Sequence, residues 1–266
     1  MKTLKVLCAA LPLFIASSIQ AAEWRDSPAV SAAFRSADLQ GTFILYDVAA
    51  DRYTVHDRQR AQTRFVPAST FKIPNTLIGL TVGSVKSVDE VLPYGGGKQM
   101  FKAWEQDMHL RDAIKVSNVP VYQELARRTG AERMREQLAR IGYGNQDIGT
   151  VVDRFWLDGP LKISAEEQTV FLARLAQDAL PFPRAAMAAT REIALVERTP
   201  GYALHAKTGR TFDDKRDIGW WVGWVEKGGK VYAFALNADM RSDADAPKRI
   251  EVARASLRAL GVLPAE

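Results

Sequence analysis

Segments with strand character lie towards both ends of this 266-residue chain, and a long stretch of helical character separates them. Residues typical of strands are concentrated in five short segments, at 41–47, 52–56, 202–207, 218–226 and 231–237. From 69 to 189, apolar residues recur mostly at three- and four-residue spacing, as on one face of a helix, for example from Leu110 to Val116. Within this stretch, Ser164 to Glu167 form a capping box that predicts the start of a further helix. If the two groups of strands share one sheet, the helical stretch must leave that sheet as an insertion. This order therefore predicts an α+β fold.

The expected sheet is central and antiparallel, and a helix from each end of the chain is expected to flank it. Ser27-Pro28 is typical of a helix start, and an amphipathic pattern from Pro247 to Leu260 predicts the last helix. We therefore expect residues 22–266 to form a single, α/β-sandwich-like domain of two lobes. The sheet lobe is predicted to comprise residues 22–65 and 190–266, and an all-helical lobe residues 66–189.

Residues 1–21 are typical of a secretory signal peptide. Lys2 and Lys5 supply the positive start, and an apolar stretch from Val6 to Ile19 follows. This stretch is short for a membrane-spanning helix, which needs about 20 residues, although an uncleaved membrane anchor is the alternative. The only cysteine, Cys8, lies inside the signal. We therefore expect an exported, periplasmic protein with no disulfide bond and no stable membrane span after cleavage.

Composition argues against two classes of binding protein. The net charge of +5 is mild, and lysine and arginine are scattered rather than grouped in a stripe, so nucleic acid is not an expected partner. The three histidines are isolated, and neither an H-E-x-x-H motif nor a histidine–cysteine cluster is present. No metal site is therefore expected.

The most informative local feature is a serine and a lysine three residues apart, Ser69 and Lys72, in an apolar segment. If a helix begins at Ser69, both residues share one face, with Cβ atoms roughly 5–6 Å apart. The unpaired N–H groups of a helix start favour a nucleophile whose attack creates an oxyanion. Burial among residues such as Val66 and Phe71 would lower the pKa of Lys72 and make it a base. The alternative is an N-capping serine with a solvated lysine one turn later.

Three further patterns are weak by themselves. Ser117-Asn118-Val119 follows a helical stretch and precedes a proline, so it is expected on a turn. Lys207-Thr208-Gly209 ends a predicted strand. Tyr143-Gly144-Asn145 opens a long loop that passes Phe155-Trp156-Leu157. Their common order along the chain is much more specific than any one of them.

Together these motifs resemble those of the penicillin-recognising serine hydrolases and transpeptidases. Within that group the sequence is similar to the class D β-lactamases, or oxacillinases. The matching residues are Pro67 to Lys72, Ser117 and Val119, Tyr143 to Asn145, Trp156, Lys207 to Gly209 and Gly219 to Trp224. The resemblance implies a serine β-lactamase of the corresponding fold, acting on small-molecule β-lactams and conferring resistance to these antibiotics.

The resemblance also implies catalytic roles. Ser69 would form the acyl-enzyme, and Lys72 would react with carbon dioxide to give N6-carboxylysine, the general base. No cofactor other than this carbon dioxide or bicarbonate is expected. The indole N–H of Trp156 would donate to the carbamate, although a core aromatic residue is the alternative. Ser117 would carry a proton to the departing ring nitrogen, and the nearby Lys207 would tune this proton transfer.

Substrate-binding roles follow from the same resemblance. Val119, Thr208 and Gly209 would contact the substrate, and the backbone N–H groups of Ser69 and Arg210 would form the oxyanion hole. Arg210 departs from the family, which usually has an aromatic or apolar residue there. Arg249 matches the carboxylate-binding position, and its planar fork suits two-point binding. The alternative for Arg249 is an exposed helix charge.

Two other activities remain open on the sequence. A penicillin-sensing receptor domain, or a peptidoglycan transpeptidase or carboxypeptidase, would become acylated without fast turnover. A Ser-His-Asp triad is possible, because His56, His109 and His205 are present, but no triad signature supports it. A homodimer is possible as well, and the sequence leaves the oligomeric state undecided.

Overall fold

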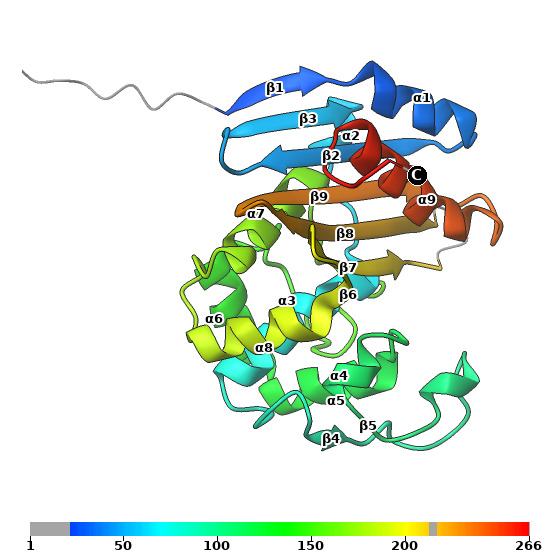
Figure 1. The fold of residues 1–266 in the computed structure, drawn as a ribbon. Helices are drawn as coiled ribbons and strands as arrows, with labels where there is room; N and C mark the ends of the chain where they lie inside the picture. The colour runs from blue at the N-terminus through cyan, green and yellow to red at the C-terminus, as the bar shows by residue number, and fades with distance from the viewer. Residues whose placement is uncertain (1–21, 213–216, 266) are drawn as a thin grey trace, which may run out of the picture.

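In this computed structural model, which describes residues 22–212 and 217–265, seven strands form one sheet in the order β1-β3-β2-β9-β8-β7-β6 (Figure 1). In chain order the strands are β1 (Glu23–Asp26), β2 (Gly41–Asp47), β3 (Arg52–His56), β6 (Leu195–Arg198), β7 (Ala203–Arg210), β8 (Ile218–Lys227) and β9 (Lys230–Asp239). β9 is antiparallel to both β2 and β8, so strands from both ends of the chain meet inside the sheet. The predicted signal peptide lies outside the described residues.

All five strands predicted from the sequence are confirmed, with small differences at their ends. β1 and β6 were not predicted, because each has four residues, lies at an edge of the sheet and buries no side chain. β1 also runs parallel to β3, so the sheet is not wholly antiparallel. The chain makes this parallel pair possible by crossing through a helix and β2 before it reaches β3.

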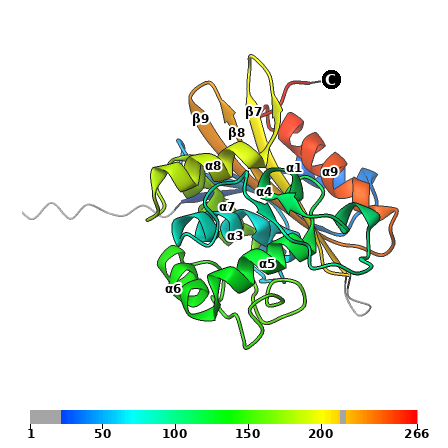
Figure 2. The same cartoon turned by 90° about the horizontal axis from the view of Figure 1, so that it is seen from below.

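Two helices, α1 (Pro28–Ser36) and α9 (Asp245–Ala259), pack together on one face of the sheet (Figures 1 and 2). Ser27 caps α1 by accepting a hydrogen bond from the Val30 N–H at 3.3 Å. Val30 and Phe34 of α1 and Leu257 of α9 are buried in one cluster with Phe234 of the sheet. The predicted flanking helices are confirmed.

The other face of the sheet is covered by the helical lobe (Figure 1). The helices of the lobe are α3 (Lys72–Thr81), α4 (Leu110–Ala113), α5 (Val119–Thr129), α6 (Ala131–Ile141), α7 (Ala165–Ala176) and α8 (Arg184–Ala194), with short 3₁₀ turns at η1 (Ala68–Phe71) and η2 (Lys102–Trp104). The short helix α2 (Arg58–Ala61) precedes the lobe and contacts β2 and α7. α7 packs against β2, β8 and β9. The predicted capping box opens it, since Ser164 and Glu167 each accept a hydrogen bond from the backbone N–H of the other. Within the described residues, no helix is long and apolar enough to cross a membrane.

Three details of the helical lobe differ from the prediction. The lobe is not all-helical, because β4 (Val91–Leu92) and β5 (Met108–His109) form a two-stranded ladder. Glycines 95 to 97, all with positive φ, help the intervening loop to bring these strands together. The helix expected over 110–116 is short, because the Asn118 N–H bonds to the Ala113 carbonyl at 2.8 Å and the chain turns there. α8 continues past the boundary expected at 189, since Thr190 and Ile193 extend its buried face.

Candidate active site

The segment around Ser69 begins with η1, which continues directly into α3. Ala68 has a φ of +49°, a left-handed conformation that is costly for a residue with a side chain. The Pro67 carbonyl accepts hydrogen bonds from the Thr70 backbone N–H at 3.2 Å and from its hydroxyl at 2.7 Å. Ser69 therefore lies in the first turn of a continuous helical segment, as predicted, but this turn is 3₁₀ rather than α.

Lys72 is fully buried, and its Nζ donates a hydrogen bond to the Ser69 Oγ at 2.8 Å. The Tyr122 ring lies 5.3 Å from the same Nζ. Burial, helped by the charge of Lys207, holds the pKa of Lys72 well below its usual range. The predicted burial of this lysine is confirmed, and the solvated lysine of the alternative is not observed. The structure therefore places beside the serine hydroxyl an amine whose charged form is disfavoured by burial.

Ser117 lies on the turn between α4 and α5, with a left-handed φ of +56°. Asn118 anchors this turn from its buried position. The Asn118 Oδ1 accepts a hydrogen bond from the Val121 N–H at 3.1 Å, and its Nδ2 donates to the Trp104 carbonyl at 3.4 Å. The turn brings Ser117 and Val119 into the same cleft as Ser69, which lies far from both in the sequence.

β7 presents Lys207, Thr208 and Gly209 beside the cleft. The buried Lys207 Nζ donates to the Thr208 carbonyl at 3.0 Å and to its hydroxyl at 3.2 Å. Burial, helped by the charge of Arg249, lowers the pKa of Lys207 to about 7. A Cβ on Gly209 would lie 2.9 Å from the Pro67 carbonyl oxygen, so glycine lets this strand approach η1 closely.

Two arginines that border the cleft differ in their side-chain partners. Arg249, on α9, donates to the Gly209 carbonyl, and its buried Nε has no partner among the described residues. Burial and the charge of Arg210 lower the pKa of Arg249 to about 10. Arg210 itself is paired with Asp217 and with Asp243, at 2.6 Å in each case. Arg249 is thus partly buried rather than a fully exposed helix charge, and it lies beside Gly209 in the lining of the cleft.

A loop between α6 and α7 carries Trp156. Asn145 closes its base, because the Asn145 Oδ1 accepts from the Lys162 N–H and its Nδ2 donates to the Pro160 carbonyl, both at 2.8 Å. Trp156 is fully buried and stacks on Phe71, which directly precedes Lys72, with 5.4 Å between ring centroids. The Trp156 Nε1 is also buried, without a partner in the described part of the chain. An unpaired buried donor is costly, so an acceptor placed here would be stabilised.

These elements enclose a cleft of about 1020 Å³. The predicted site residues that line it are Ser69, Ser117, Val119, Thr208, Gly209, Arg210 and Arg249. Lys72, Trp156 and Lys207 are buried and lie outside that lining. The cleft also has an apolar rim that was not predicted from the sequence, in which the Phe101 ring lies 4.7 Å from the ring of Trp104 and 6.4 Å from that of Phe212. Aromatic residues three positions apart at 101 and 104 were an available signal for part of this rim.

The described histidines offer no base to Ser69. Each contacts a different residue: His56 Nδ1 lies 2.9 Å from the Ser31 Oγ, His109 lies 3.3 Å from Asp112, and His205 Nδ1 lies 2.9 Å from the Arg191 carbonyl. Across residues 22–212 and 217–265, no group of three or more histidine, cysteine, aspartate or glutamate side chains could hold a metal ion. The lysine is therefore the base candidate that the geometry supports.

A buried lysine beside a serine at a helix start, facing a serine turn and a Lys-Thr-Gly strand, defines the class of penicillin-recognising serine hydrolases. A family model described as the penicillin binding protein transpeptidase domain matches residues 37–258. The β-lactamase OXA-5 of Pseudomonas aeruginosa is 39% identical over 264 residues, which cover 98% of this chain and 99% of the relative. The β-lactamase OXA-48 of Klebsiella pneumoniae is 37% identical over 265 residues, covering 98% and 100%.

Solved structures narrow the class further. FUS-1 (OXA-85), a class D β-lactamase from Fusobacterium nucleatum subsp. polymorphum, superposes with a TM-score of 0.87 at 43% identity, over 90% of this chain and 100% of the other. A class D β-lactamase from Nostoc gives a TM-score of 0.86 at 41% identity, over 88% and 99%. The chain belongs to the class D β-lactamases, which makes it an enzyme of the serine hydrolase type.

Proposed function

We propose that this enzyme hydrolyses the amide bond of penicillins, oxacillin-type compounds among them, through an acyl-enzyme on Ser69. The general base in this proposal is Lys72 converted to N6-carboxylysine by carbon dioxide. The observation that carries the proposal is the fully buried Lys72 Nζ, 2.8 Å from the Ser69 Oγ. Burial disfavours the ammonium form, and carbon dioxide reacts only with a neutral amine.

The surroundings of Lys72 fit a carbamate. Its formation joins the amine nitrogen to the carbon of carbon dioxide and releases one proton, so the buried group becomes an anion. The Nε1 of Trp156, which has no partner among the residues that the structure describes, is a donor that such an anion would satisfy. The buried Phe71, which directly precedes Lys72, and the partly buried Val119 and Leu157 of the cleft lining would keep water away from this group. When formed, the carbamate supplies an anionic oxygen that can accept a proton.

The remaining steps use side chains of this chain. Ser69 gives up its hydroxyl proton and its Oγ forms a bond to the lactam carbonyl carbon; the carbon–nitrogen bond then breaks. The departing nitrogen needs a proton, which Ser117 delivers. Lys207 tunes this transfer, because a pKa of about 7 lets it exchange a proton near neutral pH. Water finally attacks the ester carbon, and the Ser69 oxygen leaves and recovers a proton.

Penicillins carry a carboxylate, and the cleft has groups to bind it. Lys207, the Thr208 hydroxyl and Arg249 would hold the carboxylate, the last through its fork of donors. The place of Arg249 in the lining of the cleft, with Thr208 and Gly209, supports this assignment. The oxyanion would lie against the backbone N–H groups of Ser69 and Arg210. In this proposal Arg210 contributes its backbone rather than its side chain, which is occupied by two aspartates.

Steady-state hydrolysis of a chromogenic β-lactam such as nitrocefin, measured with and without added bicarbonate, tests the proposal. Ser69→Ala should abolish turnover. Lys72→Ala should leave at most a stalled acyl-enzyme, detectable as a stable mass increase. Wild-type activity should fall after acid treatment or degassing and recover with bicarbonate, because both treatments remove the carbamate. Full activity of Lys72→Ala without added short carboxylates would contradict the lysine mechanism.

The same assay separates the two alternatives that share this fold. A penicillin-sensing domain would give one burst of acylation and then stop. A transpeptidase or carboxypeptidase would release penicillin only over many minutes or longer. Continuous turnover of excess nitrocefin is expected here and would exclude both.

Export to the periplasm is part of the proposal, with residues 1–21 as the cleaved signal. Mass spectrometry of the protein from a periplasmic extract should give an N-terminus near Ala22. A product that retains Lys2 and stays in the membrane fraction would contradict it. Homodimerisation is left to light scattering of the purified protein, which would report its mass directly.

A further inference from the structure

Two aromatic rings pack against the ring of Trp156. Phe71 stacks on it with an interplanar angle of 26°, and Phe155 meets it edge to face at a centroid distance of 4.9 Å. Such contacts set the plane of a ring, but they tolerate a range of lateral offsets. The position of the indole N–H within that plane therefore depends on where the backbone of the loop is held.

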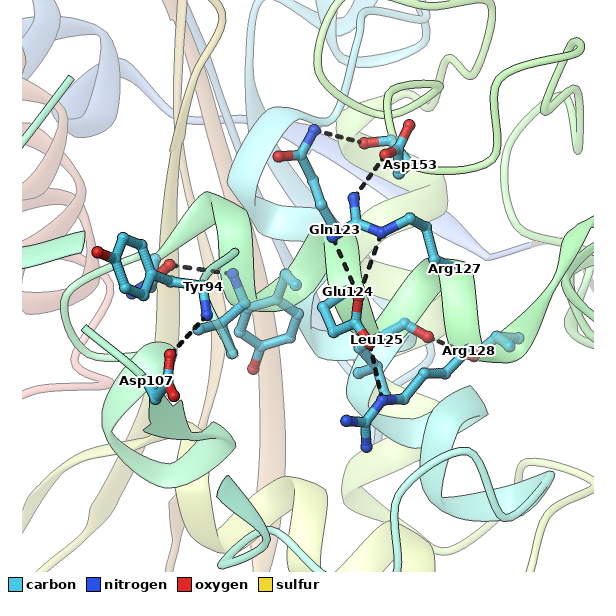
Figure 3. A network of polar contacts seen from close by, with 12 residues as sticks. Tyr94, Asp107, Gln123, Glu124, Leu125, Arg127, Arg128 and Asp153 are labelled. Atoms are coloured by element: carbon cyan, nitrogen blue, oxygen red, sulfur yellow. Dashed lines mark hydrogen bonds and ion pairs between the residues drawn. The ribbon is translucent and has the colours of Figure 1, made fainter. Parts of the chain in front are cut away.

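The backbone just before Trp156 is held by α5. The Gln123 Nε2 donates to the Asp153 carbonyl at 3.0 Å, and the Arg127 Nη1 pairs with the Asp153 carboxylate at 2.7 Å. Figure 3 shows both side chains reaching from the helix to this residue of the loop. Within the loop, the Leu157 N–H bonds to the Arg154 carbonyl at 2.8 Å, so a tight turn joins Asp153 to the ring-bearing residue.

The same helix contacts Lys72. Tyr122, the residue before Gln123, places its ring 5.3 Å from the Lys72 Nζ. Its carbonyl accepts from the Asn75 Nδ2 at 3.1 Å, which fixes α5 to the helix that carries Lys72. One helix thus touches the lysine through Tyr122 and the tryptophan loop through Gln123 and Arg127.

We propose that Asp153, held by Gln123 and Arg127, is a positioning residue that keeps the Trp156 N–H aligned with the carbamate on Lys72. The inference rests on the proposed carbamylation and adds the residues that tune it. These side chains do not line the cleft, so their effect should fall on carbamate occupancy and kcat rather than on substrate binding.

The chain supplies a matched control in the adjacent ion pairs. Arg128 pairs with Glu124 and with Glu90, at 2.9 Å in each case, and Figure 3 shows it beside Arg127 on α5. Arg127 also contacts Glu124, at 3.1 Å. Both arginines therefore pair with Glu124 and with one further carboxylate, but Arg127 alone of the two reaches Asp153. Changes at Glu124 and Arg128 leave the two contacts to Asp153 in place.

The experiment titrates the protein with ¹³C-bicarbonate and follows the lysine carbamate signal by NMR, with nitrocefin kinetics on the same samples. Gln123→Ala/Arg127→Ala should need about tenfold more bicarbonate for half-maximal carbamate, as expected for the loss of roughly one net hydrogen bond of stabilisation. At subsaturating bicarbonate its kcat should fall in parallel while KM changes less than about twofold. Glu124→Ala/Arg128→Ala should match wild type. Asp153→Asn should need about threefold more bicarbonate than wild type for half-maximal carbamate, because it keeps its backbone acceptor.

A wild-type bicarbonate requirement in Gln123→Ala/Arg127→Ala would overturn the inference, as would an equal rise in Glu124→Ala/Arg128→Ala. Recovery of the carbamate signal at high bicarbonate shows that the variant is folded and that its affinity for carbon dioxide has changed. If wild type gives no carbamate signal at any bicarbonate concentration, the proposed lysine chemistry itself fails, and this inference fails with it.

Discussion

Replacing the buried lysine of β7 should make the protein more stable while removing its activity. Lys207 is only 5% exposed, and burial with the charge of Arg249 lowers its pKa from 10.5 to about 7. Holding a group in an environment that lowers its pKa this far costs folding free energy whenever the unfolded chain is protonated. Lys207→Met removes that cost and places an apolar side chain of similar length there, so the free energy of unfolding should rise.

The expected gain in the free energy of unfolding follows from the pKa values of Lys207 in the unfolded and folded states. Their difference corresponds to about 5 kcal/mol, at roughly 1.4 kcal/mol per pKa unit, and to about 4 kcal/mol at pH 7, where half of the folded molecules are protonated. Loss of the hydrogen bonds to Thr208 offsets about 1 kcal/mol. The variant should therefore be about 3 kcal/mol more stable at pH 7. By the same calculation, this advantage should fall to about 1 kcal/mol at pH 9.

The stability advantage of Lys207→Met over wild type should shrink as pH rises from 7. Below about pH 7 the folded and unfolded states both carry the charge, and the whole cost applies. Between about 7 and 10.5 the unfolded state still binds the proton but the folded state does not, so wild type gains stability relative to the variant as pH rises. Urea denaturation followed by tryptophan fluorescence at pH 7, 8 and 9 measures the difference. Lys230→Met, at an exposed lysine of the same sheet, is the control.

Two outcomes would refute this reasoning. Wild type could prove more stable than Lys207→Met at pH 7, or the difference between them could stay constant from pH 7 to 9. Either result would mean that Lys207 keeps an ordinary pKa in the folded protein. The control variant should show no such pH-dependent difference from wild type.

Three further predictions concern the walls of the site. Trp156→Phe keeps a ring against Phe71 but removes the indole N–H, so the bicarbonate concentration needed for half-maximal carbamate should rise by about 10- to 100-fold, which corresponds to the free energy of a hydrogen bond to a charged group. An unchanged requirement would remove Trp156 from the mechanism. Asn145→Ala removes both side-chain hydrogen bonds at the base of the loop and should lower the free energy of unfolding by roughly 1–3 kcal/mol, measured in urea. Gly209→Ala would place a Cβ 2.9 Å from the Pro67 oxygen, and nitrocefin turnover should fall at least about tenfold, since an angstrom-scale displacement of reacting groups is costly. Wild-type turnover in this variant would show that η1 can shift to make room without disturbing the site.

Local patterns were sufficient for much of the fold. The capping box at Ser164 and Glu167 and the helix start at Ser27-Pro28 were predicted correctly, because each depends on residues within one turn. The predicted strands were found for a related reason, since their β-branched and aromatic residues are buried in the centre of the sheet. Edge strands β1 and β6 were missed, because an edge position buries too little to leave a pattern.

The properties of the site likewise divide into those that are local in the sequence and those that arise only in the folded protein. By itself the sequence determined that Ser69 and Lys72 share a helical turn and that Lys72 lies in an apolar segment, because both properties are local. Only the tertiary structure decided that Tyr122 faces the lysine and that Arg249 reaches the Gly209 carbonyl. It also decided that the Trp156 N–H is buried without a partner in the described part of the chain. These relations join segments far apart in the chain. Their geometry is set by packing between the sheet and the helical lobe, and spacing along a sequence carries no measure of that packing.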